Sequence, residues 1–339
     1  MAEGMSKELP SLRDLFWAHR GLLSNKWEQY IPIYESELGP HLERGAPLAL
    51  LEIGVQNGGS LEIWHKLLPP QSRVVGLDLN ERCHELKLSE GIELYIGDAT
   101  HEAFIDSALG ETCFDIVIDD GSHRSKDVIA SFTILFRRLK PGGIYIVEDL
   151  HTSYWPAYGG GFRAEGSSIE WAKNFVDAIN VDHIESTSEL PDDELARLHA
   201  FNTEIARIAF YDSLFVLQKH LSAKQRPFAR LLTGAEFPIF DPTQWIEKMR
   251  DESFGNLKVG PAAAGRLEAS LKQRIDEKER KLKRQEQALK RQRQELTRLR
   301  SSTSWKVTAP IRRARNILNY CATCMHKVGQ WARVRRSTG

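Results

Sequence analysis

Cysteine is scarce in this chain, with four residues among 339. So few cysteines do not support a disulfide framework, which favours a reducing, cytoplasmic compartment. Cys321 and Cys324 have the spacing of a redox or zinc pair, but no second pair of ligands follows nearby in the sequence. We therefore interpret this spacing as incidental.

Long hydrophobic runs are missing as well. No stretch reaches the roughly 18 consecutive apolar residues that a membrane-spanning helix needs, so no segment is expected to cross a membrane. The first residues also lack the basic start and apolar centre of a secretory signal. We expect a cytoplasmic protein, with any membrane contact confined to the inner face of the cell membrane.

An excess of one charge is absent overall, because 46 Lys and Arg balance 46 Asp and Glu. The balance hides an asymmetry. Residues 271–339 hold 20 basic and 5 acidic residues, a net charge of +15, so the preceding part carries −15. Such a distribution indicates an anionic partner for the C-terminal stretch, either a membrane or nucleic acid.

Two apolar segments, 114–118 and 144–147, are rich in β-branched residues and end abruptly in polar side chains. A helical segment joins them, which predicts a βαβ unit whose parallel strands end at the same edge of a sheet. The residues at or just beyond the two strand ends are Asp119, Asp120, His123, Glu148 and Asp149. Ligands bind at this edge in open α/β sheets, so the cluster favours a metal or substrate site over simple helix capping.

Three further strand patterns, at 48–53, 73–78 and 92–97, precede this unit. Acidic or glycine residues mark their ends, namely Glu52, Gly54, Gly58, Asp78 and Asp98. Glycine lets a backbone approach a ligand closely, a helix N-terminus suits an anion, and an acidic residue on the next strand suits a ribose. The order predicts an α/β fold with a doubly wound, mostly parallel sheet, followed by a helical extension.

This ordered set resembles the class I methyltransferases that use S-adenosylmethionine. More narrowly, the chain resembles the metal-dependent sugar O-methyltransferases of the macrocin/mycinamicin type. The similar segments are 51–55, 58–61, 119–123, 141–143 and 148–155. The resemblance covers about residues 11–220, where 201–218 fit the closing antiparallel hairpin of that fold. Gln56 and Asn57 stand where the family has more glycine.

The resemblance implies transfer of a methyl group from S-adenosylmethionine to a sugar hydroxyl, in bacterial surface-glycan or glycosylated-metabolite biosynthesis. It implies cofactor contacts by Glu52, Gly54, Gly58, Asp78, Asp98 and Asp119. It implies a divalent cation, Mg²⁺ being our first choice, held by Asp120, Glu148 and Asp149. Adjacent strand residues point to opposite faces, so Asp119 and Asp120 should differ in role. His123 is placed to act as the general base.

Aromatic side chains follow the acidic cluster. Tyr154, Trp155 and Tyr158 precede the glycines at 159–161. We expect Tyr154 and Trp155 to contact the sugar, with the glycine-rich loop as a lid, although plain packing explains these residues equally well.

Three other functions stay open. A cephalosporin hydroxylase-like oxygenase has a similar sequence in this region, but a single histidine argues against a two-histidine iron site. A nicotinamide-dependent oxidoreductase is not favoured by Asp98 or by the Glu148–Asp149 pair. A non-catalytic scaffold acting through a coiled coil would not need an intact acidic cluster.

The composition changes after about residue 260. Apolar residues follow a heptad-like spacing at Leu271, Ile275, Leu282, Leu289, Leu296 and Leu299. The alternate seam positions are polar, namely Lys278, Gln285 and Gln292. This pattern predicts a coiled coil that could support a homo-oligomer, or a long solvated helix. Residues 301–312 resemble a short segment found at the end of bacterial enzymes of surface-polysaccharide pathways.

The last stretch, 311–336, mixes apolar residues with seven Lys and Arg and holds no acidic residue. It suits an interfacial helix on an anionic membrane or a disordered basic tail, and nucleic acid is the less favoured partner. The expected organisation is an N-terminal helical segment (1–45), a methyltransferase domain (46–255), a coiled coil or long helix (262–302) and a basic amphipathic tail (303–339).

Overall fold

The computed structural model describes residues 11–184, 190–226, 228–239, 242, 256–303, 307, 308 and 310. The chain divides into two compact units, Met1–Lys224 and Gln225–Gly339. The domain boundary expected at residue 255 and nearly all of the basic tail lie outside the described residues, so they stay predictions.

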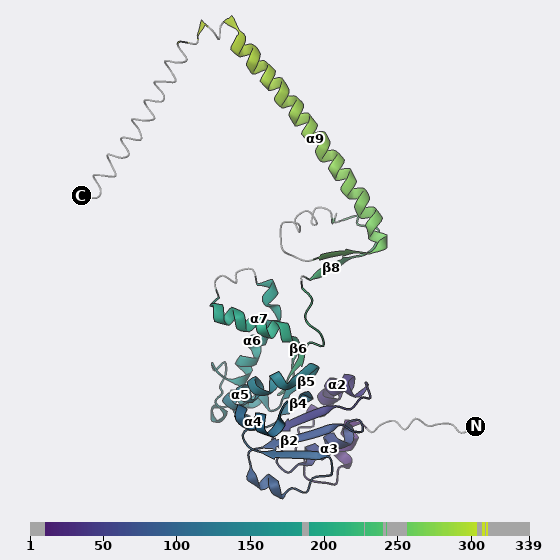
Figure 1. Ribbon diagram of the computed structural model, residues 1–339, viewed down its shortest axis with the longest axis vertical. Coiled ribbons are helices and arrows are strands. Elements are labelled where there is room, and N and C mark those ends of the chain that lie inside the picture. The colour runs from purple at the N-terminus through teal and green to yellow at the C-terminus, as the bar shows by residue number, and fades with distance from the viewer. Residues whose placement is uncertain are drawn as a thin grey trace, which may run out of the picture. The chain divides into compact units, whose positions relative to one another are not determined.

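The first unit is built on a seven-stranded sheet of order β3-β2-β1-β4-β5-β7-β6 (Figure 1). Neighbours from β3 to β5 pair in parallel, and β7 pairs antiparallel with both β5 and β6. The strands are β1 (Ala49–Ile53), β2 (Arg73–Asp78), β3 (Ile92–Ile96), β4 (Phe114–Asp119), β5 (Leu139–Val147), β6 (Ile205–Phe210) and β7 (Phe215–Lys219). The prediction of a doubly wound, mostly parallel sheet with a closing hairpin is confirmed.

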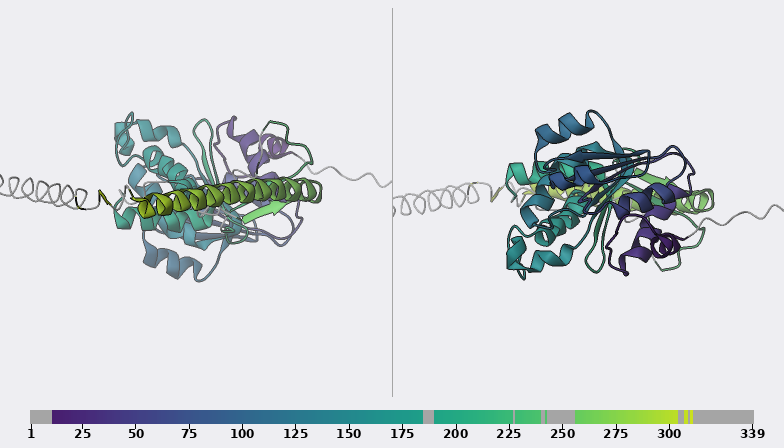
Figure 2. Two further views of the ribbon diagram at one scale, coloured as in Figure 1. Left: turned by 90° about the horizontal axis from the view of Figure 1, so that it is seen from above. Right: turned by 90° about the horizontal axis from the view of Figure 1, so that it is seen from below.

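Helices cover both faces of this sheet (Figures 1 and 2). One face packs against α1, α2 and α3, and the other packs against α4 to α7. The helices are α1 (Leu12–Ala18), α2 (Tyr30–Leu42), α3 (Gly59–Leu67), α4 (Glu102–Leu109), α5 (Ser125–Leu135), α6 (Ser168–Asn180) and α7 (Asp192–Glu204). Because both faces are covered, the central strands must be apolar along their whole length rather than alternating.

The core between the sheet and helices α4 to α7 is rich in aromatic residues. Phe132 of α5 lies with its ring centroid 5.0 Å from that of Tyr145 on β5 and 4.9 Å from that of Trp171 on α6. These contacts hold both helices against the sheet. An exception to the apolar interior is Glu52, which lies within β1 and is fully buried. A buried carboxylate needs a partner, and its partner marks the functional site.

Strand β5 begins earlier than the sequence pattern indicated. We expected it to start at residue 144, after the Pro-Gly-Gly stretch, but it starts at Leu139, which pairs with Phe114. The register then shifts between Phe114 and Ile116, and Gly142 takes a left-handed backbone (φ 78°). The Pro-Gly-Gly stretch is therefore a bulge inside the strand, a role that suits glycine.

The second unit contains a short parallel pair, β8 (Ala229–Leu232) with β9 (Asn256–Val259), and the 41-residue helix α9 (Pro261–Ser301). In α9 only Ala263 and Leu267 are buried. The prediction of a long helix here is confirmed. Within the part of the chain that the structure describes, no helix combines the length and apolarity needed to cross a membrane.

Candidate functional site

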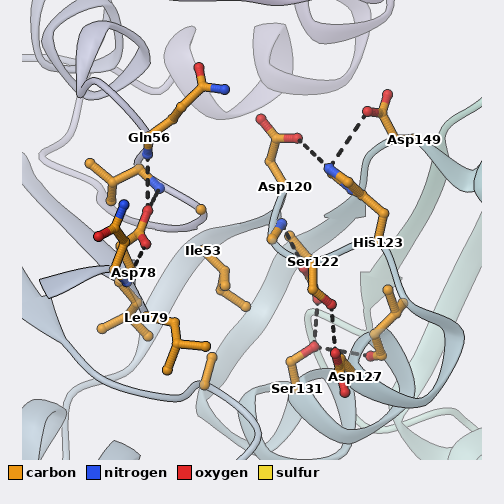
Figure 3. Close-up of a pocket in the computed structure, with 18 of the residues that line it drawn as sticks. Ile53, Gln56, Asp78, Leu79, Asp120, Ser122, His123, Asp127, Ser131 and Asp149 are labelled. Carbon is orange, nitrogen blue, oxygen red and sulfur yellow. Dashed lines mark hydrogen bonds and ion pairs between the residues drawn. The ribbon is translucent and has the colours of Figure 1, made fainter. Parts of the chain in front are cut away.

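A cavity of about 660 Å³ opens at the carboxyl edge of the parallel strands (Figure 3). The residues after β1, β2, β3 and β4 line it, as the topology of an open α/β sheet predicts. A second wall comes from residues 23–26, which precede α2. This N-terminal contribution had no equivalent among the site residues expected from the sequence.

The glycine turn after β1 forms the floor of the cavity. Gly54 has φ 87°, and a Cβ added there would lie 2.0 Å from the carbonyl oxygen of Asp120. Only glycine therefore allows the ends of β1 and β4 to come so close. Gly58, with φ 83°, is the N-cap residue of α3. The turn thus delivers the start of a helix to the cavity, where an anionic group is favoured.

Asp78, at the end of β2, braces this turn. Its Oδ2 accepts hydrogen bonds from the backbone N–H groups of Val55 (2.8 Å) and Gln56 (3.0 Å), as Figure 3 shows. Its Oδ1 accepts from the N–H of Asn80 (2.8 Å). Gln56 has φ 51°, so a residue other than glycine occupies a left-handed position here, and Asp78 helps to hold it.

Asp98 follows β3 and lines the same cavity. Its carboxylate accepts from the Thr100 hydroxyl (2.7 Å) and backbone N–H (2.8 Å), and lies 2.9 Å from Nδ1 of His101. Burial alone would raise the pKa of Asp98, but these contacts outweigh it and lower the pKa. Asp98 therefore faces the cavity as a carboxylate.

Asp119 and Asp120 point to opposite sides of β4, as expected. The buried Asp119 accepts a 2.5 Å hydrogen bond from Ser131 of α5 and lies 3.3 Å from the Tyr145 hydroxyl. Burial raises its pKa. Asp120 faces the other side, where it meets Lys26 and His123. The two neighbouring carboxylates therefore serve different parts of the site.

Lys26 is the centre of the most buried part of the site. Its Nζ lies 2.6 Å from Asp120 Oδ2, 2.6 Å from Glu148 Oε1 and 3.1 Å from Glu52 Oε1. The side chains of Lys26 and Glu148 are 2% exposed, and that of Glu52 is fully buried. Burial would lower the pKa of Lys26, but the three carboxylates together raise it well above its usual value. The ammonium therefore stays charged.

The carboxylates around Lys26 are not fully neutralised by it. Burial raises the pKa of Glu148 to about 8 and that of Asp120 to about 6, against the lowering effect of Lys26. Tyr34 of α2 donates a 2.5 Å hydrogen bond to Glu148 Oε1. Glu52 also accepts from Ser60 Oγ (2.6 Å). At neutral pH Glu148 therefore holds a proton, which a further cation would compete with.

A second group of possible metal-ligand atoms lies beside the carboxylates that surround Lys26. One atom each from Asp120, His123 and Asp149 lies within 4.8 Å of the others. His123 Nε2 is 3.9 Å from Asp120 Oδ1 and 3.7 Å from Asp149 Oδ2, so the imidazole sits between two carboxylates (Figure 3). Its Nδ1 is buried without a hydrogen-bond partner. His123 and Asp149 both hold left-handed backbones (φ 56° and 53°), a strain typical of functional sites.

The structure separates the two carboxylates that the sequence placed side by side. Asp149 faces the cavity and accepts a 2.7 Å hydrogen bond from the Tyr30 hydroxyl. Glu148 lies behind it, bonded to Lys26 and Tyr34. Its role as a metal ligand stays a prediction, and so do the assigned roles of the other site residues.

The expected substrate residues lie on the surface near Asp149. Tyr154 is 42% exposed and Trp155 is 49% exposed, both in the segment after β5. Trp155 is in ring contact with His151 and Tyr158, and Tyr158 lines the cavity. Their exposure permits contact with an acceptor.

Sequence reasoning missed three side chains of the N-terminal segment that bond to the acidic residues of the site. Tyr30 and Tyr34 share a helical face, which indicates a buried helix but not contact with the acidic edge. Lys26 stands in no recognisable motif. Its position depends on how residues 19–26 cross the start of α3, where the N–H of Gly59 donates to the Leu23 carbonyl (3.2 Å).

Comparisons with known proteins agree with this geometry. Residues 51–150 match the family model of a methyltransferase domain. The chain is 30% identical over 242 residues to the 8-demethyl-8-alpha-L-rhamnosyl tetracenomycin-C 2′-O-methyltransferase of Streptomyces olivaceus, covering 68% of this chain and 60% of that protein. It is 37% identical over 161 residues to the mycinamicin VI 2″-O-methyltransferase of Micromonospora griseorubida, covering 44% of this chain and 38% of that protein.

A solved structure is similar over the same region. It is the MycE methyltransferase of the mycinamycin pathway in complex with Mg, SAH and mycinamycin VI, with a TM-score of 0.53 and 29% identity. The match covers 63% of this chain and 54% of that protein. The chain thus resembles sugar O-methyltransferases, and it spans at most about 60% of the length of these relatives.

The burial of Lys26 leads to a test of stability. Lys26→Met would leave Glu52 and Glu148 buried without their cation, which typically costs about 3–5 kcal/mol. We expect this loss in the free energy of unfolding, measured by urea denaturation in the presence of EDTA. The matched control is Lys173→Met, which removes an exposed lysine paired with Glu170 at 2.5 Å and should cost about 0.5 kcal/mol or less. Equal losses in the two variants would contradict a central role for Lys26.

Proposed function

We propose that this chain, which has the class I methyltransferase fold, moves a methyl group from S-adenosylmethionine to a sugar hydroxyl with the help of a divalent cation. The observation that carries the proposal is the juxtaposition of Asp120, His123 and Asp149 beside the cavity of the glycine turn. The relatives methylate sugars of glycosylated compounds according to their names. We place the chain in the biosynthesis of surface glycans or glycosylated metabolites.

The cofactor fits the half of the cavity formed by β1, β2 and β3. The turn from Gly54 to Gly58 would hold the methionine end, where the start of α3 favours its carboxylate. Asp78 would bind the ribose, and Asp98 the adenine. Asp119 would face the cofactor from β4, while Glu52 keeps the turn attached to the acidic cluster through Lys26.

The other half of the edge fits a divalent cation. The carboxylates of Asp120 and Asp149 offer hard oxygen ligands, which Mg²⁺ prefers. We propose Glu148 as the third ligand. To bind the cation, its carboxylate would have to change its contact with Lys26. When bound, the cation would supply charge stabilisation for a hydroxyl oxygen that is losing its proton.

The reaction needs a base and alignment. His123 Nε2 takes the proton from the acceptor hydroxyl, and the oxygen attacks the methyl carbon. When bound, S-adenosylmethionine would supply the methyl group and would leave as a neutral thioether, because the electron pair of its carbon–sulfur bond would pass to sulfur. The carboxylates on either side of His123 stabilise the imidazolium that forms. Holding the oxygen in line with the methyl group supplies much of the remaining rate.

The second unit would join two copies of the chain and would attach them to the membrane. The apolar seam of α9, at Ile275, Leu282, Leu289 and Leu296, is at least half exposed. In a parallel pair with a second copy, Arg274 and Lys281 would face Glu279 and Glu286 of the other helix, a pattern of opposite charges that favours a parallel homodimer. The basic residues beyond α9 would bind the anionic inner face of the membrane.

Metal dependence gives the first test of this proposal. We expect EDTA to abolish methyl transfer and Mg²⁺ to restore it. Because the raised pKa values of about 6 for Asp120 and about 8 for Glu148 mean that protons compete with the cation, Mg²⁺ affinity should fall roughly tenfold or more from pH 8 to pH 6.

The same pKa values predict the pH dependence of the metal-free protein. The carboxyl pKa values are raised on folding, so the stability they contribute is present at low pH and is lost as pH rises through about 6 to 8. Calorimetric titration of Mg²⁺ at both pH values, with thermal unfolding in EDTA, measures both effects. Full turnover after exhaustive chelation would refute the metal assignment.

The role of His123 gives another test. His123→Ala should lower kcat by roughly 10²-fold or more because the acceptor hydroxyl loses its base. Affinity for S-adenosylhomocysteine, measured by calorimetry, should stay the same, since His123 lies on the metal side of the cavity. His199→Ala, at an exposed position of α7, is the matched control. If His123→Ala kept the wild-type kcat, His123 would not be the base and its role would be structural.

The basic tail gives a third test. The full chain should sediment with vesicles containing phosphatidylserine at low salt, because each Lys or Arg near an anionic surface contributes about 1 kcal/mol. A version ending at Ser302 keeps the whole of α9, including the buried Ala263 and Leu267, and should stay in the supernatant with its methyl transfer intact. Higher salt should weaken the binding. Equal sedimentation of both versions would exclude the tail as the membrane contact.

A further inference from the structure

A row of aromatic side chains runs along the acidic edge and reaches the cavity at Tyr158. The ring centroids of Trp27 and His151 are 6.1 Å apart, those of His151 and Trp155 are 4.9 Å apart, and those of Trp155 and Tyr158 are 5.8 Å apart. The N-terminal segment supplies Trp27, and the segment after β5 supplies the other three. We call these four residues the aromatic row.

Both ends of the aromatic row adjoin the site. Tyr158 lines the cavity, and Trp27 directly follows Lys26, which also lines it. His151 is fixed in the middle because its Nδ1 is hydrogen-bonded to Ser213 Oγ, which lies 2.8 Å from the Tyr30 hydroxyl oxygen. Tyr30 in turn holds Asp149. The row is therefore anchored to the side chains that form the acidic edge.

The row is exposed where packing would bury it. Trp27 is 53% exposed and Trp155 is 49% exposed. Rings of this size contribute large binding areas, and their electron-rich faces attract the polarised C–H groups of a sugar ring. Two half-exposed tryptophans in one chain of ring contacts, beside a cavity with carboxylates, leave ring faces accessible to a ligand.

The tilt of the rings restricts what can bind. The interplanar angles are 90° for Trp27 and His151, 73° for His151 and Trp155, and 59° for Trp155 and Tyr158. A fused, flat aromatic compound could stack on several of these rings at once only if they were coplanar, and they are not. Separate chair-shaped sugar residues need one ring face each and can turn at every glycosidic bond.

We propose that the aromatic row binds the sugar residues next to the one that is methylated, so that the acceptor is an oligosaccharide or glycan chain rather than a single sugar. This deepens the proposed function, since it rests on a sugar acceptor at the same site. Trp27 is a specificity residue in this account, and it comes from outside the 51–150 segment that matches the methyltransferase family.

The experiment measures carbohydrate binding without methyl transfer. The full chain, with Mg²⁺ and S-adenosylhomocysteine, is applied to an array of bacterial mono-, di- and trisaccharides and of aromatic glycosides. We expect binding to di- and trisaccharides above that to the matching monosaccharides. Trp27→Ala and Trp155→Ala should each weaken oligosaccharide binding by about 3- to 10-fold. Trp27→Phe, which keeps an aromatic ring, should retain most of it.

The matched control is Trp17→Ala, because Trp17 lies in the same N-terminal segment, is 86% exposed and is not part of the row. It should bind like the parent protein. The inference would be overturned if no oligosaccharide bound, or if Trp27→Ala and Trp155→Ala bound oligosaccharides as tightly as the parent protein. A preference for aromatic glycosides would also overturn it. If oligosaccharide binding depended on the aromatic row but the protein transferred no methyl group, the proposed function would be refuted. The inference that the row binds sugars would still hold.

Discussion

A single buried ammonium group among three carboxylates organises the functional edge of this protein. Lys26 reaches the ends of three neighbouring strands by contacting Glu52, Asp120 and Glu148. Without a cation, such buried carboxylates would repel each other and could not stay ionised in so small a volume. The segment before α2 is thus as necessary to the site as the strands themselves, because it supplies the charge that lets the acidic residues converge.

The alternation of side chains along β4 divides this edge into two halves. Asp119 bonds with Ser131 of α5 on one face, while Asp120 meets Lys26 and His123 on the other. The glycine turn lies against the end of the same strand, since Gly54 almost touches the Asp120 carbonyl. A cofactor in the glycine-turn half and a cation in the other half would therefore be neighbours, which is what transfer of a group between two bound molecules requires.

Much of the first unit could be predicted from the sequence, for physical reasons. Apolar strands of a covered parallel sheet show as continuous runs, and their carboxyl ends must share one edge, so Asp120, His123 and Asp149 could be brought together from spacing alone. Lys26 could not, since its approach depends on tertiary packing across α3 and no local pattern marks it. Trp27 was missed for the same reason. Glu148 and Asp149 lie apart because successive residues at a strand end point to opposite sides and Asp149 takes a left-handed backbone.

We infer that one edge of the sheet carries two adjacent but distinct binding sites. This inference is tested most directly by calorimetric titration of S-adenosylhomocysteine and of Mg²⁺ into Asp78→Asn and Asp149→Asn. We expect Asp78→Asn to lose affinity for S-adenosylhomocysteine and keep its affinity for Mg²⁺, and Asp149→Asn to show the reverse. Loss of both ligands in both variants, or unchanged Mg²⁺ affinity in Asp149→Asn, would contradict the account.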